Sequence, residues 1–434
     1  MKIKELEKHY NEEVTIQGFV ENIRDLQYVQ FVIVRDGSGK VQVTIEKNED
    51  NQKMNEVISN TTLESTILVT GTVLESPKVK LGGKEMIPTS LELTSISLPE
   101  LPIDMKNKEN TLRETRLDYR FLDLRRPEHN LLFKCETVLE HAMREYCVTH
   151  DFMEIHTPKI SAKAAESGAE VFTLDYFGQP ACLSQSPQFY KQMAMAAGFD
   201  KVFEIGPAFR AENSHTSYHA TEINMADIEL SWIRSFTEVM DMEEAWIKYS
   251  FGKVYEAYGE QIKEQFHTEL SNLTVDFPRI TFAEAKTILK EQFHYVGEKE
   301  EDFEREEEKL LCEYAKKNYD SDFIFVTKFP FSARPFYHML DEEGLTESFD
   351  LLYRGVEITT GAQREHRHDI LKNQMVEKGI QPEDLEFYLN FFRYGCPPHG
   401  GFAIGIARIM MQMFAIDNIR EATFIYRGPT RLNP

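Results

Sequence analysis

The sequence predicts an α+β protein in which a small N-terminal β-barrel precedes a larger domain built on an antiparallel sheet flanked by helices. Residues 14–100 hold five short segments of β-branched, alternating character, and turn signals separate them. Beyond residue 130, strand-like and helical segments follow one another without a regular βαβ rhythm, and no GxGxxG loop follows a strand. An antiparallel sheet is therefore expected in place of a doubly wound parallel one.

The predicted strands of the barrel follow one another closely. Their sequences are VTIQGFV, QFVIVRD, KVQVTIE, TILVTGTV and EMIPTSLELTSIS, with turn signals at 36–39 and 82–83. Five short strands in about 90 residues predict a small closed barrel, and the OB-fold is the commonest barrel of this kind that binds oligonucleotides. A barrel that binds a protein, or no ligand at all, fits the same spacing.

A polar and charged segment bounded by prolines, residues 101–127, is typical of a hinge between domains. Further along the chain, the charge run GEKEEDFEREEEK at 297–309 predicts a solvated helical face. We therefore expect a barrel at 1–103, a hinge at 104–130 and a second domain at 131–434, with a helical, acidic insertion at about 240–320.

Composition limits the classes of function. The chain has 434 residues and a formal net charge of −23, which argues against a simple phosphate-tracking nucleic-acid binder. The first 100 residues share this balance, with 11 basic against 16 acidic side chains. The five cysteines form no CxxC pair, which suits a reducing compartment. Because the N-terminus lacks the apolar core of a signal peptide and no run approaches ~18 apolar residues, we predict a cytoplasmic protein without a membrane segment.

Two motifs near the C-terminus carry the most chemical information. The stretch SFDLLYRGVEITTGAQREHRHD places Asp350 and Glu357 ahead of Arg364 and Arg367, and the glycine-rich GCPPHGGFAIGIAR ends in Arg408. Carboxylates for a divalent cation and arginines for anionic oxygens are what an ATP site needs for adenylate or phosphoryl transfer. Since no GxxxxGK[ST] loop occurs, ATP would be bound by a different architecture.

Five ordered motifs together resemble the class II aminoacyl-tRNA synthetases of subclass b, and within them the archaeal-type aspartyl-tRNA synthetases. The resemblance extends over essentially the whole chain. The motifs are TRLDYRFLDLRRP at 115–127 (hinge), FMEIHTP at 152–158 (motif 1), QSPQFYKQ at 185–192 (aspartate-specific segment), FRAE at 209–212 (motif 2) and GIAR at 405–408 (motif 3).

The resemblance implies a six-stranded antiparallel catalytic sheet, an OB-fold domain that binds the anticodon, and a homodimer with Pro158 at its interface. It also implies the reaction: L-aspartate and ATP give aspartyl-adenylate and pyrophosphate, and the 3′ end of tRNA(Asp) then takes the aspartyl group. Whether tRNA(Asn) is a second acceptor stays open.

The resemblance assigns the ATP-binding residues. Arg210 would bridge the substrate carboxylate and the α-phosphate, since a planar guanidinium can hold two oxygens. Arg408 would bind the γ-phosphate of a bent ATP. Glu212 would accept a hydrogen bond from the adenine amino group, and His219 would contact the outer phosphates.

Mg²⁺ is the second cofactor that the resemblance implies. Asp350 and Glu357 would carry the ion, with Thr360 in the place of the serine usual near it. Carboxylate and hydroxyl oxygens are hard ligands suited to this hard ion.

Substrate choice is assigned to four positions. Lys191 and Arg364 match the two residues that bind the side-chain carboxylate of aspartate, and such a pocket rejects the neutral amide because its cations would stay unpaired. Gln188 and Glu166 match positions near the substrate ammonium, with Glu166 as a gate over the amino acid. A plain surface loop is the alternative for Glu166.

In the barrel, Phe31 and Gln42 match positions that stack on and hydrogen-bond to the anticodon. Phe31 as a core residue is the alternative. The choice between tRNA(Asp) and tRNA(Asn) depends in the family on a few barrel positions, where this chain has Glu21, which indicates neither behaviour, and Lys78, which favours strict discrimination.

Several positions depart from the family pattern, and they keep two alternatives open. A diverged paralogue would activate aspartate or asparagine but pass it to an acceptor other than tRNA. A non-catalytic binding or regulatory protein would retain only the fold. The departures are Tyr218 for the arginine of Arg-His in motif 2, Ile223-Asn224 for an aromatic at the adenine, Ala407 for an acid, Thr360 for serine, and Ile425-Tyr426-Arg427 for Phe-Pro-Arg.

Overall fold

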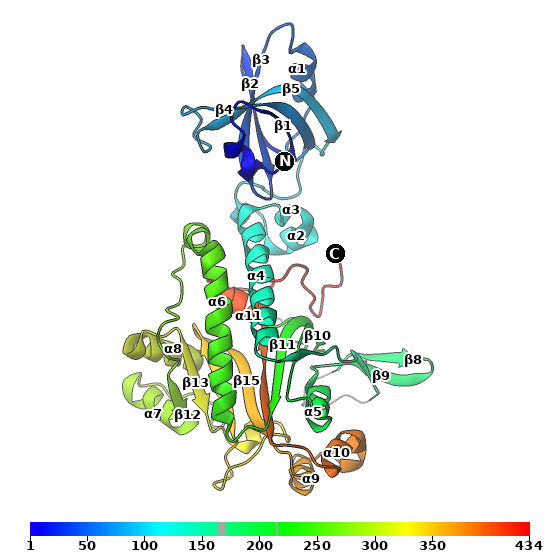
Figure 1. Ribbon diagram of the computed structural model, residues 1–434, viewed down its shortest axis with the longest axis vertical. Coiled ribbons are helices and arrows are strands. Elements are labelled where there is room, and N and C mark those ends of the chain that lie inside the picture. The colour runs from blue at the N-terminus through cyan, green and yellow to red at the C-terminus, as the bar shows by residue number, and fades with distance from the viewer. Residues whose placement is uncertain (163–170, 214–215) are drawn as a thin grey trace. The chain divides into compact units, whose positions relative to one another are not determined.

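The chain folds into two compact units, Met1–Asn130 and Leu131–Pro434. The structure is a computed structural model that describes residues 1–162, 171–213 and 216–434. Figure 1 draws the first unit in blue to cyan and the second from cyan through green and yellow to red. Each unit has a hydrophobic core of its own.

The first unit contains the predicted five-stranded barrel, which is closed in the order β1-β2-β3-β5-β4. Neighbouring strands pair antiparallel except β3 and β5, which are parallel. Because side chains alternate along a strand, residues such as Val32, Val34, Val41 and Val43 fill the barrel core. The elements are η1 (Ile3–Lys8), β1 (Glu13–Asp25), β2 (Val29–Asp36), β3 (Gly39–Glu46), α1 (Gln52–Ser59), β4 (Thr66–Glu75) and β5 (Lys84–Ser95).

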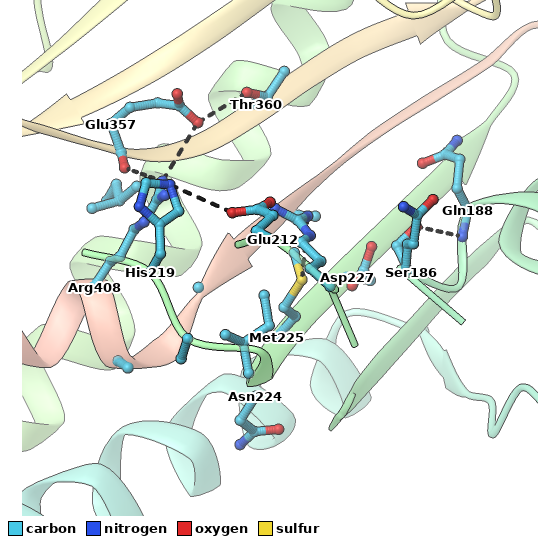
Figure 2. Close-up of a pocket in the computed structure, with 18 of the residues that line it drawn as sticks. Ser186, Gln188, Glu212, His219, Asn224, Met225, Asp227, Glu357, Thr360 and Arg408 are labelled. Carbon is cyan, nitrogen blue, oxygen red and sulfur yellow. Dashed lines mark hydrogen bonds and ion pairs between the residues drawn. The ribbon is translucent and has the colours of Figure 1, made fainter. Parts of the chain in front are cut away.

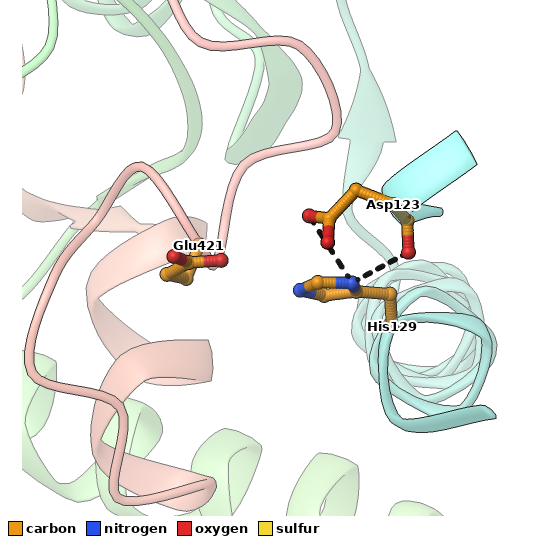
Figure 3. A group of neighbouring side chains, drawn as sticks. All are labelled: Asp123, His129 and Glu421. Carbon is orange, nitrogen blue, oxygen red and sulfur yellow. Dashed lines mark hydrogen bonds and ion pairs between the residues drawn. The ribbon is translucent and has the colours of Figure 1, made fainter. Parts of the chain in front are cut away.

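The segment after the barrel is organised around one buried carboxylate, that of Asp123. Arg116, Arg120 and Arg126 donate hydrogen bonds to it at 3.3, 2.8 and 2.9 Å. His129 lies against the same residue, with Nδ1 2.9 Å from the main-chain oxygen of Asp123 (Figure 3). Three guanidinium groups offset the cost of burying this charge, so the segment is a folded element. Its helices are η2 (Lys108–Asn110), α2 (Arg113–Asp118) and α3 (Arg120–Asp123).

The second unit is built on an eight-stranded sheet with the order β12-β13-β14-β15-β16-β11-β10-β6. The six strands from β13 to β10 pair antiparallel, as predicted, and the short outer strands β12 and β6 add in parallel, so the sheet is mixed. The strands are β6 (Met153–Glu154), β10 (Lys201–Phe209), β11 (Glu222–Ser231), β12 (Arg279–Thr281), β13 (Phe323–Thr327), β14 (Ser348–Tyr353), β15 (Val356–Arg364) and β16 (His399–Gly405).

Helices α4, α6 and α11 bury one face of this sheet. Their apolar side chains share one core with sheet residues such as Phe203, Ile228 and Phe402, and Figure 1 shows α6 running across β15. The opposite face of the central strands carries the polar side chains described below. These helices are α4 (Pro127–Thr149), α6 (Phe236–Phe266) and α11 (Ile406–Met413).

The remaining helices and a small second sheet complete the second unit. The prediction that 297–309 is a solvated face is wrong in part, because α8 packs on β13 and buries Glu307, whose carboxylate lies 2.8 Å from Lys286. The elements are β7 (Ile160–Ser161), β8 (Thr173–Tyr176) and β9 (Gln179–Leu183), which form a small second sheet, and α5 (Gln188–Ala196), α7 (Phe282–Gln292), α8 (Arg305–Tyr319), η3 (Phe331–Ala333), α9 (His368–Glu377), η4 (Pro382–Leu385) and α10 (Glu386–Arg393). In the described part of the chain, every helix is too short or too polar to cross a membrane.

Candidate active site

A cavity of about 400 Å³ lies on the sheet face opposite to α4, α6 and α11. Its walls come from β11, β15 and β16 and from the beginnings of α5 and α11, and its volume is that of a small-molecule site. Eight residues predicted from the sequence line it: Gln188, Arg210, Glu212, His219, Glu357, Thr360, Arg364 and Arg408.

Strand β11 brings two acids to this wall. Ala226 and Ile228 point into the core, and the alternation of the strand turns Asp227 and Glu229 to the opposite face, where both are buried. Burial raises the pKa of Asp227. For Glu229 burial acts in the same direction, but the charges of Arg364 and Lys191 prevail and lower its pKa. Glu229 is therefore held as the charged partner of these two cations.

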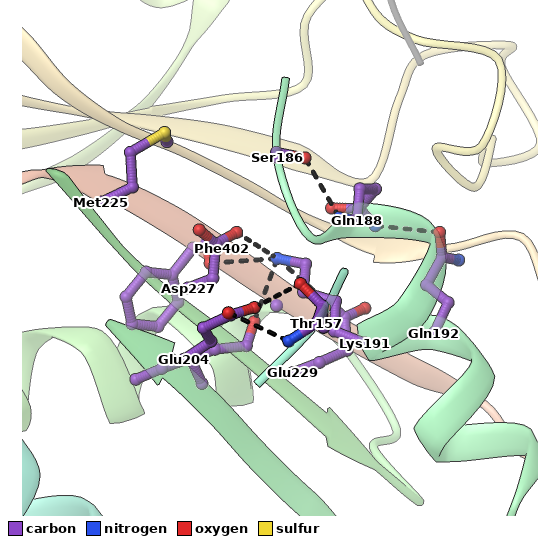
Figure 4. A network of polar contacts seen from close by, with 12 residues as sticks. Thr157, Ser186, Gln188, Lys191, Gln192, Glu204, Met225, Asp227, Glu229 and Phe402 are labelled. Carbon is purple, nitrogen blue, oxygen red and sulfur yellow. Dashed lines mark hydrogen bonds and ion pairs between the residues drawn. The ribbon is translucent and has the colours of Figure 1, made fainter. Parts of the chain in front are cut away.

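Lys191 lies behind this wall. Helix α5 buries its side chain, and its ammonium is 3.2 Å from Asp227 and 3.3 Å from Glu229 (Figure 4). It also donates to the main-chain oxygens of Ile228 and Phe402 at 3.4 and 3.2 Å. An ammonium has three hydrogens, so all of them have acceptors within the protein. A direct bond from Lys191 to a ligand would require one of these contacts to open.

Arg364, at the end of β15, is a cation that does line the cavity. Its guanidinium donates to Glu229 at 3.0 and 3.3 Å and to the main-chain oxygen of Gly401 at 2.9 Å. A Cβ atom at Gly401 would collide with the main-chain oxygen of Ile228 and with the Glu229 carboxylate, so glycine permits this close approach. Nε2 of His338 lies 3.2 Å from Arg364, and burial lowers the pKa of His338, which keeps the imidazole neutral.

A β-bulge places Glu357 and Thr360 on one face of β15. Residues three apart on a regular strand point to opposite faces. In the pairing with β14, Ile358 is an extra residue, and this insertion returns Glu357 to the face that holds Thr360. The Thr360 hydroxyl donates to the Glu357 carboxylate at 3.2 Å (Figure 2). Asp350 is the partner of Thr360 in the register with β14, so three oxygen-bearing side chains meet here.

Asp350 is fully buried beside this group. Arg334 donates to its Oδ2 at 2.5 Å, while Oδ1 has no hydrogen-bond partner among the described residues. Burial raises the pKa of Asp350 to about 6, and the charge of Glu357 adds to this effect against the opposing charge of Arg334. An unpartnered carboxylate oxygen next to a second carboxylate and a hydroxyl is a donor set that fits a hard divalent cation such as Mg²⁺.

Arg408 and His219 face each other at the same end of the cavity (Figure 2). Arg408, in the first turn of α11, donates to the main-chain oxygen of Glu357 at 3.0 Å, and its Nη1 is 3.9 Å from the Glu357 carboxylate. Nε2 of His219 lies 3.6 Å from Glu212. Burial is the largest cause that lowers the pKa of His219, so the ring is neutral near pH 7 and can still donate one hydrogen bond.

The wall between the two ends is largely apolar. Arg210 directly follows β10, and its Nη2 is 3.9 Å from the sulfur of Met225, a weak contact. Ile223 and Asn224 both line the cavity, but the Asn224 side chain donates to Glu140 at 2.6 Å and is turned away from the other labelled residues (Figure 2). The cavity thus has an aliphatic surface where the family resemblance leads one to expect an aromatic ring.

Residues 112–426 match the family described as tRNA synthetases class II (D, K and N). The chain belongs to this family. Residues 14–94 match the OB-fold nucleic acid binding domain, in agreement with the barrel of the first unit. The fold and family predicted from the sequence are therefore confirmed for this class II synthetase.

Similarity to individual synthetases extends over the whole chain. The aspartate–tRNA(Asp) ligase of Pyrococcus horikoshii is 43% identical and covers 99% of this chain and 100% of its own. The aspartate–tRNA(Asp/Asn) ligase of Aeropyrum pernix is 41% identical, over 97% of this chain and 95% of its own.

Solved structures agree with these relatives. Asparaginyl-tRNA synthetase from Pyrococcus horikoshii, complexed with asparaginyl-adenylate, has a TM-score of 0.93 at 32% identity and covers 100% of this chain and 99% of its own. Aspartyl-tRNA synthetase from Entamoeba histolytica has a TM-score of 0.89 at 32% identity and covers 100% of this chain and 92% of its own.

The barrel residues predicted to read an anticodon lie on its outer surface. Phe31 is half-buried and stands outside the barrel core, because its neighbours on β2 are the residues that point inward. The Gln42 amide donates to the Thr44 hydroxyl at 3.2 Å, and this hydroxyl donates to Glu85 at 2.6 Å. These side chains form a polar row beside an aromatic ring on adjacent strands.

Glu166, the predicted gate, lies outside the described residues. Sequence reasoning in turn missed Asp227, Glu229, Arg334 and His338, which form or support the walls. For Asp227 and Glu229, their place in the otherwise apolar strand NMADIEL was a usable signal, because charged residues are rarely fully buried unless they are paired. For Arg334 and His338 the local sequence carries no such signal.

Proposed function

We propose that this synthetase is an aspartate–tRNA ligase, which activates L-aspartate with ATP and transfers the aspartyl group to the 3′ end of tRNA(Asp). The observation that carries this proposal is a single cavity with two differently charged ends. The full-length relatives named as aspartate–tRNA ligases support it. The amino-acid end consists of Gln188, Asp227 and Arg364, with Lys191 and Glu229 behind them, and the phosphate end consists of Arg210, His219, Glu357 and Arg408.

At the amino-acid end, Arg364 would bind the side-chain carboxylate of aspartate. Asp227 and Gln188 would receive the substrate ammonium. Lys191 would act mainly by holding Asp227 and Glu229 in place, since its ammonium is already bonded to both. A neutral amide in place of the carboxylate would leave Arg364 facing an uncharged group, which disfavours asparagine.

At the phosphate end, the reaction needs alignment and positive charge rather than a protein nucleophile. A carboxylate oxygen of aspartate attacks the α-phosphorus of ATP, and the bond from that phosphorus to the pyrophosphate oxygen breaks. Arg210 would hold the attacking carboxylate and the α-phosphate together. Arg408 and His219 would bind the outer phosphates, and Glu212 would accept a hydrogen bond from the adenine amino group.

Asp350, Glu357 and Thr360 would hold Mg²⁺. The ion, when bound, neutralises negative charge on the phosphates. The unpartnered oxygen of Asp350 and the raised pKa of this residue support the assignment, because burial and the charge of Glu357 disfavour the ionised carboxylate and a bound cation would stabilise it.

The barrel would bind the anticodon through stacking on Phe31 and a hydrogen bond from Gln42. Glu21, at a position linked to tRNA choice, is bonded to Lys40 at 2.6 Å and to Arg35 at 3.0 Å, so its carboxylate is engaged within the barrel. A cytoplasmic homodimer, with Pro158 at its interface, completes the proposal.

Charging of tRNA with labelled aspartate, in the presence of ATP and Mg²⁺, tests the proposed function. Purified tRNA(Asp) and tRNA(Asn) transcripts are offered separately, with asparagine as the competing amino acid. We expect aspartate on tRNA(Asp). Charging of tRNA(Asn) as well would extend the function to both acceptors.

Aspartate-dependent exchange of pyrophosphate into ATP separates the alternatives. Exchange without charging of either tRNA would identify a paralogue with another acceptor. A folded protein that shows neither exchange nor charging would be a non-catalytic member of the family, and the proposal would be wrong.

A further inference from the structure

Arg305, the first residue of α8, stacks on Tyr218 at the edge of the cavity. Its guanidinium carbon lies 3.6 Å from the centroid of the tyrosine ring, which is the distance of a planar stack. Tyr218 lines the cavity and directly precedes His219. A positive charge from a distant part of the sequence is thus held against the motif 2 segment.

Hydrogen bonds connect Arg305 to the phosphate end. Its Nη1 lies 3.4 Å from Oε2 of Glu308, and the same oxygen accepts a hydrogen bond from the main-chain N–H of Glu357 at 3.2 Å. The main-chain oxygen of Glu357 accepts from Arg408 at 3.0 Å. The two main-chain groups of Glu357 therefore link it to Arg408 on one side and, through Glu308, to Arg305 on the other.

Arg305 stands in the first turn of α8, where a cation opposes the helix dipole. Its pair with Glu308 in the same turn offsets this cost. The contact with Tyr218 has no such role within the helix. The field of Arg305 does reach the cavity, since burial and then the charges of Arg408, Arg210 and Arg305 lower the pKa of His219.

We propose that Arg305 is a phosphate-binding residue, which supplies to the outer phosphates of ATP a positive charge that tyrosine at position 218 cannot provide. This inference rests on the proposed function. The stack on Tyr218 fixes the plane of the guanidinium, and its N–H groups other than the one that faces Glu308 can bind phosphate oxygens. Its side chain is 42% exposed, so a ligand can reach it. The replacement of the motif 2 arginine by Tyr218 is then a relocation of the cation from this segment to α8.

Four variants test the relocation: Arg305→Ala, Arg305→Lys, the double variant Tyr218→Arg with Arg305→Ala, and Lys317→Ala as a control that removes an exposed cation from the same helix. Aspartate-dependent pyrophosphate exchange gives KM for ATP and KM for aspartate separately. We expect Arg305→Ala to raise KM for ATP about tenfold, the lower range for a charged hydrogen bond at a partly exposed site, and to leave KM for aspartate unchanged. Arg305→Lys should lie between, because it keeps the charge and loses the planar stack.

The double variant is the decisive arm, because it moves the cation back to position 218. Recovery of most of the affinity for ATP would support the proposal. A KM for ATP in Arg305→Ala that matches the wild type and Lys317→Ala would overturn it, as would an equal rise in both KM values with a lower melting temperature, which indicates a structural role. If the wild type shows no exchange, the proposed function fails. The role of Arg305 is then decided by calorimetric binding of ATP with Mg²⁺, in which the affinity of Arg305→Ala is compared with that of the wild type and Lys317→Ala.

Discussion

The two ends of the cavity differ in how their charges are balanced. At the amino-acid end, the cations Lys191 and Arg364 face the carboxylates Asp227 and Glu229 at 3.0–3.3 Å. All four side chains are buried. Two positive and two negative charges therefore compensate each other inside the protein before any ligand arrives.

At the phosphate end, three neighbouring acids share less positive charge: Arg334 lies 2.5 Å from Asp350, Arg305 lies 3.4 Å from Glu308, and Arg408 lies 3.9 Å from Glu357. Burial raises the pKa of Glu308 to about 7 and that of Asp350 to about 6, and in both cases the charge of Glu357 adds to the effect. Beneath them, on the core side of the sheet, burial raises the pKa of Glu243 to about 8, and both of its carboxylate oxygens lack a hydrogen-bond partner among the described residues.

This difference separates selectivity from catalysis. A charge-balanced end can distinguish a carboxylate from an amide, because an uncharged amide in the pocket would leave a buried cation without a negative partner. An end with acids of raised pKa and partly exposed arginines would be completed by ATP and a cation. The following variants and conditions therefore test how much each end contributes to stability and to catalysis.

The largest effect is expected for Lys191→Met. Removing this ammonium leaves Asp227 and Glu229 buried with one cation fewer, so the free energy of unfolding should fall by about 3–5 kcal/mol and aspartate-dependent exchange should be lost. Denaturant unfolding measures the first quantity. Adding Asp227→Asn to the variant should recover part of the stability. An unchanged stability of Lys191→Met would contradict the proposed difference in charge balance between the two ends.

Arg408→Ala should show the opposite pattern. A residue that stabilises charge developing in the transition state contributes to the rate, and its removal should lower kcat for pyrophosphate exchange by a factor of about 10²–10³. The free energy of unfolding should stay as in the wild type, because Arg408 is partly exposed and has one main-chain partner in the cavity wall. Near-normal exchange in this variant would remove Arg408 from the phosphate end.

Glu243→Gln should alter the pH dependence of stability. The pKa of this carboxyl is raised from 4.5 to about 8 in the folded protein, so between these values the folded state binds more protons than the unfolded state. The stability contributed by Glu243 is complete below pH 4.5 and is lost as pH rises through 8, by up to about 1.4 kcal/mol per pH unit. The difference between wild type and Glu243→Gln in denaturant unfolding should therefore grow in favour of the variant from pH 5 to 8, and parallel curves would contradict the raised pKa.

Mg²⁺ alone should give the smallest effect. If the acids of the phosphate end await a cation, Mg²⁺ at ten times its Kd should stabilise the protein by about 1.4 kcal/mol. Thermal unfolding at pH 7.5 measures this, and the gain should shrink at pH 5.5, where Asp350 is largely protonated. Glu357→Gln should reduce the gain, whereas an equal gain in that variant would place the cation elsewhere.

The sequence predicted the barrel, the antiparallel sheet and most of the cavity lining because these depend on local patterns. Alternating strands and turn signals can be recognised within short stretches of sequence. The motifs around Arg210 and Arg408 are likewise short and continuous in the chain. The pairing of Lys191 with Asp227 was not predictable in this way, because it depends on the register between β11 and its neighbours and on the packing of α5.

The charge run at 297–309 shows the limit of local reasoning most clearly. Its composition predicts solvated side chains, yet Glu307 is buried against Lys286 and Arg305 stacks on Tyr218. Both contacts join segments that lie far apart in the sequence. The composition of a charge run therefore predicts that its side chains are exposed, whereas the three-dimensional fold decides which of them is buried against a partner.

The β-bulge at Ile358 limits how this part of the protein can evolve. The hairpin between β14 and β15 turns through Arg354 and Gly355, both with positive φ, and a two-residue turn of this kind fixes the register of the strands. If the bulge were straightened without a change in chain length, Glu357 and Thr360 would be three residues apart on a regular strand and would point to opposite faces of β15. Substitutions that favour a regular strand at Ile358 should therefore be eliminated in any lineage that depends on the cation site.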